Sequence, residues 1–259
     1  MSIIFNKNII ALQTILKKEI IRFMRIWSQT LLPPAITMTL YFIIFGKLIG
    51  SQIHDIQGYS YMQYIVPGLT MMSIMTSAYA NTSSSFFGAK FSKSIEEMLV
   101  SSMPNYIILL GYTLGGALRG LLVGIIVMCI GFLFTHIPIY HYWIVFCMAI
   151  LSSLLFSLGG LLNGIFAKKF DDVSFIPTFI LTPLTYLGGI FYSIHQLPAV
   201  WQTISQCNPI LIIVSTFKYG MLGTTDINIF YGFSMVCILL LAMLVWCIYL
   251  LEKGVGLRT

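Results

Sequence analysis

The sequence predicts an all-α membrane protein with six transmembrane helices, and composition, hydropathy and the distribution of basic residues support this. Hydrophobic residues make up 58% of the 259 residues and charged residues 8%, whereas about a quarter of a typical soluble domain is charged. The mean hydropathy is +0.92, and several apolar stretches are long enough to cross a bilayer. The formal charge of +6 comes mainly from residues at the ends of those stretches, so it indicates membrane orientation rather than nucleic-acid binding.

Residues 1–27 predict an amphipathic helix at the membrane surface. On a helical projection, six apolar residues share one face: Ile9, Leu12, Leu16, Ile20, Phe23 and Trp27. Four basic residues lie opposite: Lys7, Lys18, Arg22 and Arg25. A helix with this much charge cannot span the bilayer, but it suits the headgroup layer.

The six spans are expected at residues 28–48, 64–85, 105–134, 142–167, 173–193 and 229–251. No linker divides the chain, so we expect one domain over 1–259, with the bundle over 28–251 and a tail over 252–259. The small and hydroxyl residues of 76–85 suit either close helix packing or the lining of a substrate path. Arg119 lies inside the third span, where an ionisable group needs either a fixed protein partner or a role in anion transport.

The orientation follows from the basic residues. If the N-terminus is cytoplasmic, eleven of the 14 lysines and arginines fall on the cytoplasmic side. Only Lys47 and Lys218 fall outside, and Arg119 lies within a span. Positive charge marks the cytoplasmic side, so we expect both termini in the cytoplasm and an even number of spans.

A charged interlude over residues 86–104 contains a second short helix. Ser94 followed by Glu97 matches the capping box, which predicts a helix start at Ser94, and Pro104 marks the end. The helix, 94–103, is too short to span. Its apolar stripe suits docking into a groove of a cytosolic protein.

The stretch 177–223 is almost uncharged and repeatedly broken. The breaks fall at Pro183, Gly188-Gly189, Leu197-Pro198 and Asn208-Pro209. Backbone broken at membrane depth is tolerated only where protein or a water-filled cavity satisfies it. We therefore expect this stretch to end the fifth span and then re-enter the membrane from the outer side.

The sequence contains no recognisable catalytic motif. The four histidines and five cysteines show no metal-ligand spacing, and no phosphate-binding loop is present. We therefore expect no catalytic residue, metal or cofactor on this chain, and a transport function driven by a separate motor. Two alternatives stay open: a carrier driven by an ion gradient, and an intramembrane enzyme or assembly factor.

The order and spacing of several motifs resemble a known family. They are Glu96–Val100 closing at Pro104, Tyr186–Tyr192, Leu197-Pro198, Trp201, Asn208-Pro209 and Tyr219–Gly223. The chain resembles the permease subunit of type-2 ABC exporters, which include polysaccharide, teichoic-acid and drug exporters. Lys218 departs from the pattern, since the family more often has arginine there.

The resemblance implies an assembly and a set of functional residues. Two permeases, as a homodimer, would join two cytosolic ATPases in a bacterial inner membrane, with ATP and magnesium held by the ATPases. Spans 1, 2 and 5 would line the pathway for a lipid-like, glycan or hydrophobic substrate. Residues 1–25 would form the connecting helix. Coupling to the ATPase would use Ser94, Ile95, Glu96, Glu97, Met98 and Leu99. The re-entrant motif would comprise residues 194–222 and the residues that lead into them. Its functional residues would be Tyr186, Gly188, Gly189, Phe191, Tyr192, Pro198, Asn208 and Pro209.

Overall fold

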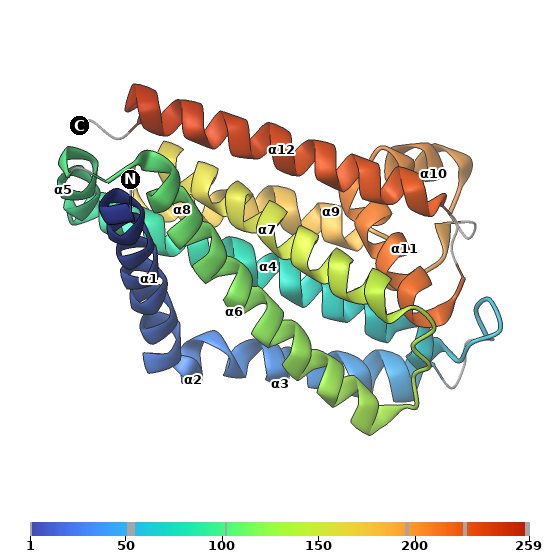
Figure 1. Ribbon diagram of the computed structural model, residues 1–259. Helices are drawn as coiled ribbons and strands as arrows, with labels where there is room; N and C mark the ends of the chain where they lie inside the picture. The colour runs from blue at the N-terminus through green and yellow to red at the C-terminus, as the bar shows by residue number, and fades with distance from the viewer. Residues whose placement is uncertain (1, 51–54, 102, 195–196, 225–226, 257–259) are drawn as a thin grey trace.

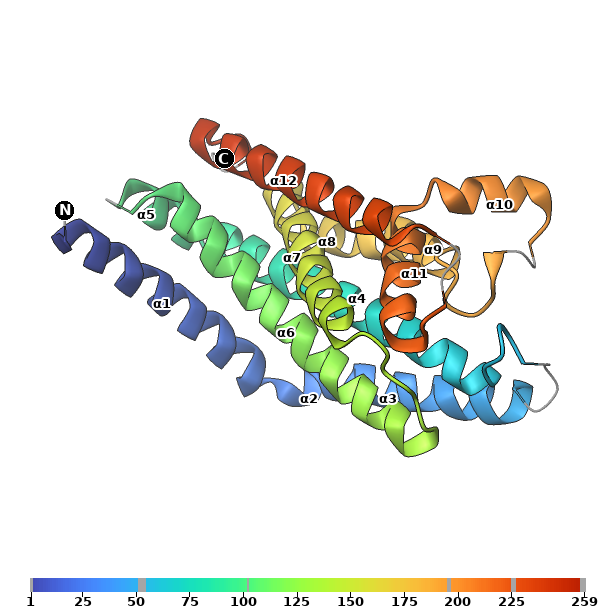
Figure 2. The same cartoon turned by 45° about the vertical axis from the view of Figure 1, so that its right-hand side comes forward.

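The protein is a helical bundle. The structure is a computed structural model that describes residues 2–50, 55–101, 103–194, 197–224 and 227–256, with side chains from residue 7 onward except those of 47–49. Within these ranges there is no strand. The start of α1 (Ser2–Arg25), α5 (Ser94–Val100) and the end of α12 (Ile229–Lys253) gather at one end of the bundle (Figures 1 and 2). The opposite end carries α10 (Ala199–Gln206) and α11 (Pro209–Leu222).

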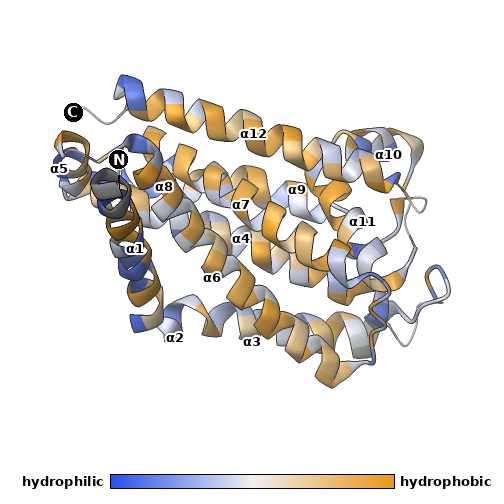
Figure 3. Ribbon diagram, in the orientation of Figure 1, coloured by the Kyte–Doolittle hydropathy of each residue, from blue (hydrophilic) through white to orange (hydrophobic). Residues whose placement is uncertain are grey.

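Hydrophobic residues cover most of the length of the long helices, and hydrophilic residues gather at the two ends and along α1 (Figure 3). Four described helical segments are long and apolar enough to cross a membrane: Trp27–Gly46, Asn105–Phe134, Tyr142–Phe166 and Ile229–Lys253. They coincide with the first, third, fourth and sixth predicted spans. The all-α prediction is therefore confirmed for the described residues.

The second predicted span lies inside α4 (Tyr61–Phe91), which has 31 residues. Its many hydroxyl residues lower its hydropathy, so α4 is not among the four segments. A capping box starts the helix, with the Ser60 hydroxyl accepting from the Gln63 amide at 3.4 Å. The second span was predicted to end at residue 85, but the helix α4 continues to Phe91, six residues into the charged interlude.

The first and fifth predicted spans are irregular. The first is built from α2 (Trp27–Thr30), α3 (Leu32–Tyr41) and the π-helix η1 (Phe42–Ile49). The fifth is built from α8 (Phe170–Ile176), the π-helix η2 (Pro177–Leu181) and α9 (Thr182–Tyr186). The predicted end of the fifth span at residue 193 was wrong. The helix ends at Tyr186, because Gly189 adopts φ +66° and turns the chain.

α4 is the central helix, and small residues let its neighbours approach closely. On α6 (Asn105–Phe134), Gly116 and Gly120 face α4, and a side chain at either would collide with it. On α7 (Tyr142–Phe166), Gly160 lies directly over the backbone carbonyl of Tyr79. The sequence of α6 and α7 thus fixes how tightly the bundle closes around α4.

Polar groups link the three helices inside the bundle. The hydroxyls of Thr82 and Ser157 lie 2.6 Å apart, and Ser157 Oγ donates to the Thr113 carbonyl at 2.7 Å. Asn163 Nδ2 donates to Ser83 Oγ at 3.0 Å. All five residues are buried. Of the two predictions for residues 76–85, these contacts agree with helix packing.

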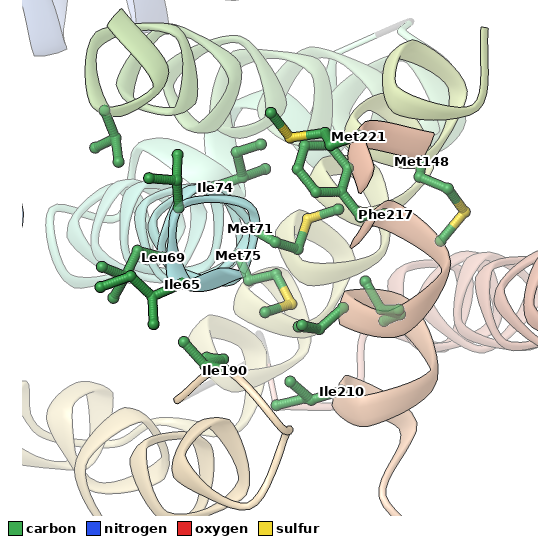
Figure 4. Packing of buried hydrophobic residues seen from close by; sticks show 14 of the residues in the cluster. Ile65, Leu69, Met71, Ile74, Met75, Met148, Ile190, Ile210, Phe217 and Met221 are labelled. Atoms are coloured by element: carbon green, nitrogen blue, oxygen red, sulfur yellow. The ribbon is translucent and has the colours of Figure 1, made fainter. Parts of the chain in front are cut away.

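Two hydrophobic clusters fill the bundle. The larger joins α4 to α7 and α11 and includes Ile190 from the turn after α9. Figure 4 shows ten labelled members of it: Ile65, Leu69, Met71, Ile74, Met75, Met148, Ile190, Ile210, Phe217 and Met221. The smaller joins α1, α5, α6, α7 and the end of α12. Close packing of apolar side chains therefore holds both the broken segment and α5 against the long helices.

Candidate functional site

The short helix α5 projects from the end of the bundle where α1 begins and α12 ends (Figure 1). Ile95 is 1% exposed and belongs to the smaller cluster, and Met98 and Leu99 pack partly against that cluster. Glu96 and Glu97 are exposed on the other side. The apolar stripe predicted for docking thus anchors α5, and the two carboxylates face outward. The predicted helix extends to residue 103, but the observed one ends at Val100; residue 102 lies outside the described residues.

The capping box predicted at Ser94 was wrong. Lys93 is the N-cap, in the left-handed conformation with φ +60°, and it makes no side-chain cap. Ser94 is already helical, and its hydroxyl donates to the Ala89 carbonyl at 3.1 Å. Only two residues separate α4 from α5, so the free carbonyls at the end of α4 attract the serine hydroxyl instead.

A basic and aromatic cavity of about 510 Å³ lies beside α5. Its walls come from the ends of α4 and α7 and from residues that follow α4, α7 and α12: Phe87, Lys90, Phe91, Lys93, Phe166, Lys168 and Gly256. The ammonium group of Lys90 is held in place by the carbonyls of Ile165 and Ala167, each at 2.7 Å. This end of the bundle therefore offers lysines and exposed aromatic rings next to two carboxylates.

At the other end, the turn after α9 is clamped by hydrogen bonds from α4 and α11. Tyr61 and Tyr64 donate their hydroxyls to the carbonyls of Phe191 and Tyr192 at 3.1 and 3.0 Å. Lys218, which is 5% exposed, donates to the Gly189 carbonyl at 2.8 Å, and its ammonium lies 3.4 Å from the centroid of the Tyr64 ring. Lys218, which the charge distribution assigned to the outer side of the membrane, is thus buried within the protein, where it satisfies backbone that the glycine turn leaves open.

Asn208 joins α9 to α11. Its Oδ1 accepts from the amide of Ile210 at 3.0 Å, which caps α11, and its Nδ2 donates to the Leu184 carbonyl at 2.6 Å. Pro209 follows as the first residue of α11, where a missing amide proton costs least. Pro198 lies one position earlier relative to its helix, as the N-cap of α10. The Asn-Pro and Leu-Pro breaks therefore each start a helix.

Aromatic rings of α3 and η1 pack against the turn that follows α9. The Phe191 ring lies 5.1 Å from Phe45, 5.7 Å from Tyr41 and 6.0 Å from Tyr186. Tyr192 donates its hydroxyl to the Tyr186 carbonyl at 3.0 Å. Gly188 sits where a side chain would press against Ile210. The structure thus brings Tyr186, Gly188, Phe191 and Tyr192 of the predicted motif together. Pro198 lies at the start of α10, and residues 195–196 lie outside the described ranges.

Arg119 has fixed protein partners. Its guanidinium donates to Asn81 Oδ1 at 3.4 Å and to the Thr30 carbonyl at 3.3 Å. Arg22 of α1 donates to the same Asn81 Oδ1 at 2.7 Å and to the Asn81 carbonyl at 3.1 Å. Two arginines from distant parts of the chain therefore meet at one asparagine of α4.

Sequence reasoning missed Glu19, which completes this cluster. Its carboxylate is fully buried, accepts from Ser85 Oγ at 2.6 Å and pairs with Arg22 at 3.2 Å. A signal was present: Glu19 is the sole acidic residue before Asp55. On the helical projection it lies about 20° from Leu12, at the edge of the apolar stripe. An acid at that position must bury its charge against a partner.

Long apolar helices packed through glycines, with a short exposed helix at one end and a clamped, broken segment at the other, define a polytopic membrane protein of the all-α class. The family model described as ABC-2 type transporter matches residues 10–222, and the chain belongs to that family. It is 54% identical over 250 residues to the inner membrane transport permease YadH of Escherichia coli K12, covering 96% of this chain and 98% of that one. It is 25% identical over 208 residues to nodulation protein J of Rhizobium leguminosarum bv. viciae, covering 77% of each chain.

Proposed function

We propose that this chain is the permease subunit of an ATP-driven exporter in a bacterial inner membrane, and that a separate cytosolic ATPase docks at α5. The observation that carries the proposal is the geometry of α5. Its apolar residues are used to hold it to the bundle, while Glu96 and Glu97 face outward. A helix that is fixed on one side and charged on the other can pass movement between a partner and the membrane helices. The name of the Escherichia coli relative supports both the transport role and the membrane.

The surface around α5 supports a protein partner of mixed charge. The cavity beside it is lined by Lys90, Lys93 and Lys168 together with three phenylalanines. Aromatic anchors surrounded by charges are typical of protein interfaces. ATP and magnesium would be bound by the ATPase, and the substrate would be lipid-like, a glycan or hydrophobic.

The topology we propose has six spans with both termini in the cytoplasm. α4 and the broken series α8, η2 and α9 would add the second and fifth spans to the four apolar segments. α10 and α11 would then be the outer re-entrant helices, which is supported by their place beside the start of α12 (Figure 1). Two copies of the chain would form the transporter, with the pathway between them lined by spans 1, 2 and 5.

The proposal is tested by replacing Glu96 and Glu97 together with alanine in the permease, co-expressed with its candidate ATPase partner. Because both side chains are exposed, the variant should keep its thermal stability but lose co-purification of the ATPase and the effect of the permease on ATP turnover. Glu252→Ala, an exposed carboxylate at the same end of the bundle, is the matched control. Normal co-purification and unchanged ATP turnover in the double variant would refute docking at α5.

A further inference from the structure

A cavity of about 410 Å³ lies between the end of α1, α4, α6 and the start of the broken fifth span. Its walls are formed by Arg22, Ile26, Gln29, Thr30, Ala80, Ser84, Arg119, Val173, Ser174, Pro177 and Thr178. These lining residues include two arginines and no acidic residue. The volume falls in the range of small-molecule sites, which is about 300–1,000 Å³.

Hydrogen-bond donors are in surplus around this cavity. Asn81 Oδ1 accepts from both Arg22 and Arg119, so the two guanidinium groups lie side by side. Among the described residues, the Nε atoms of both arginines and Nδ2 of Asn81 are buried without a hydrogen-bond partner. Buried polar groups are normally satisfied. All three unsatisfied atoms are donors, so the missing partner is an acceptor.

The charge of the cluster points the same way. Within the described ranges, the one recorded ion pair joins Glu19 to Arg22. The second oxygen of the Glu19 carboxylate accepts from Ser85, and the protein groups to which Arg119 donates are uncharged. Glu19 offsets only one of the two arginine charges, so the cluster keeps one uncompensated positive charge, which an anion beside Arg119 would offset.

We propose that this cavity binds a phosphate group through Arg22 and Arg119. Guanidinium groups match the oxygens of phosphate in a fork geometry, and Gln29, Ser174 and Thr178 provide polar side chains from the neighbouring walls. The cavity is larger than phosphate alone, and Ile26, Ala80 and Val173 give it apolar walls for an attached organic group. The phosphate belongs either to a lipid headgroup or to the free ion, and both present the same oxygens.

The binding test uses the full-length chain purified in dodecyl maltoside, with its melting temperature followed by tryptophan fluorescence. The probes are dioleoyl phosphatidic acid in mixed micelles, sodium phosphate, and sodium chloride at matched ionic strength. We expect a saturable rise in melting temperature with a phosphate probe and none with chloride. Arg22→Gln and Arg119→Gln should each weaken the apparent affinity about tenfold or more, since each removes charged hydrogen bonds.

Two further variants keep the test decisive. Arg25→Gln changes an exposed arginine of the same helix that does not line the cavity, so it should bind normally. Ser84→Leu leaves both arginines in place but fills the cavity from an exposed position of α4, so it should fold and lose binding. This variant covers the case in which removal of Arg22 destabilises α1.

A response to phosphatidic acid alone would identify a lipid headgroup, and a response to sodium phosphate as well would identify the free ion; both support the site. The proposal is overturned if neither probe gives a saturable shift, or if Arg22→Gln, Arg119→Gln and Ser84→Leu respond like Arg25→Gln. Binding is the readout, so a negative result would leave the proposed transport function standing.

Discussion

Asn208 should be one of the most sensitive polar positions of the broken segment, and replacing it by alanine tests how that segment is held. The side chain is 4% exposed and makes two hydrogen bonds. Its Oδ1 accepts from the Ile210 amide, and its Nδ2 donates to the Leu184 carbonyl. Loss of the cap costs about 1 kcal/mol, and a buried carbonyl left without its donor costs a further ~1–3 kcal/mol. The sum is about 2–4 kcal/mol, which corresponds to a fall in melting temperature of roughly 4–16 °C for a chain of this size.

The chain supplies its own control in Asn228, which caps α12 by accepting from the Phe230 amide at 3.0 Å. Asn228 is exposed, so Asn228→Ala should cost only about 0.5–1 kcal/mol, or about 1–4 °C. Asn208→Asp separates the two bonds of Asn208, because it keeps the cap and turns a carboxylate oxygen toward the Leu184 carbonyl. Thermal unfolding of the three variants in the same detergent is the assay. Equal shifts for Asn208→Ala and Asn228→Ala would show that the bond to Leu184 contributes nothing.

Two further variants test packing and pH dependence. Gly160→Ala should lower stability by about 1–3 kcal/mol, because its methyl group would collide with the Tyr79 carbonyl. The methyl group of Gly159→Ala meets only the Tyr79 ring at 3.5 Å, so this variant should be neutral or stabilising. Similar melting temperatures for the two variants would refute the packing argument. Backbone amides of the two preceding lysines lower the pKa of Asp172, so its stabilisation is present above the pKa of a free aspartate and is lost as pH falls through the lower folded value. Asp172→Asn should remove that part of the acid sensitivity of the melting temperature, and Asp171→Asn should retain it.

The regular helices were predictable because their signals are local. The third predicted span matches α6 over residues 105–134, and the fourth and sixth differ from α7 and α12 by one or two residues. Where a long apolar run is bounded by turn residues, the position of each helix end can be predicted to within a few residues. The end of α4 was harder to predict. Gly88 and Lys90 interrupt the apolar run of the sequence, but Phe86, Phe87 and Ala89 are buried and the helix continues through them.

The site residues were predictable as a group, but their contacts were not. The breaks at 188–189 and 208–209 identified the turn and the start of α11. The roles of Lys218 and Asn208 depend on carbonyls 29 and 24 residues away, and no local pattern encodes those distances. The same holds for Arg119, whose partners come from α2 and α4. Long-range polar pairing is decided by how the helices pack, and one sequence shows only which residues need a partner.

The buried carboxylate of Glu19 has a mechanical consequence for the first helix. It bonds to Ser85 of α4, and its methylene groups cover Gly115 of α6. Glu19 and Arg22 both lie on α1, so their ion pair would move with the helix, but sliding α1 along the bundle would break the hydrogen bond from Ser85 to the Glu19 carboxylate. A hydrogen bond to a charged group contributes about 1.5–3 kcal/mol, so the sliding would be opposed by an energy of that order. One buried side chain therefore fixes α1 to both α4 and α6, and we expect a displacement of α1 to move these two helices with it.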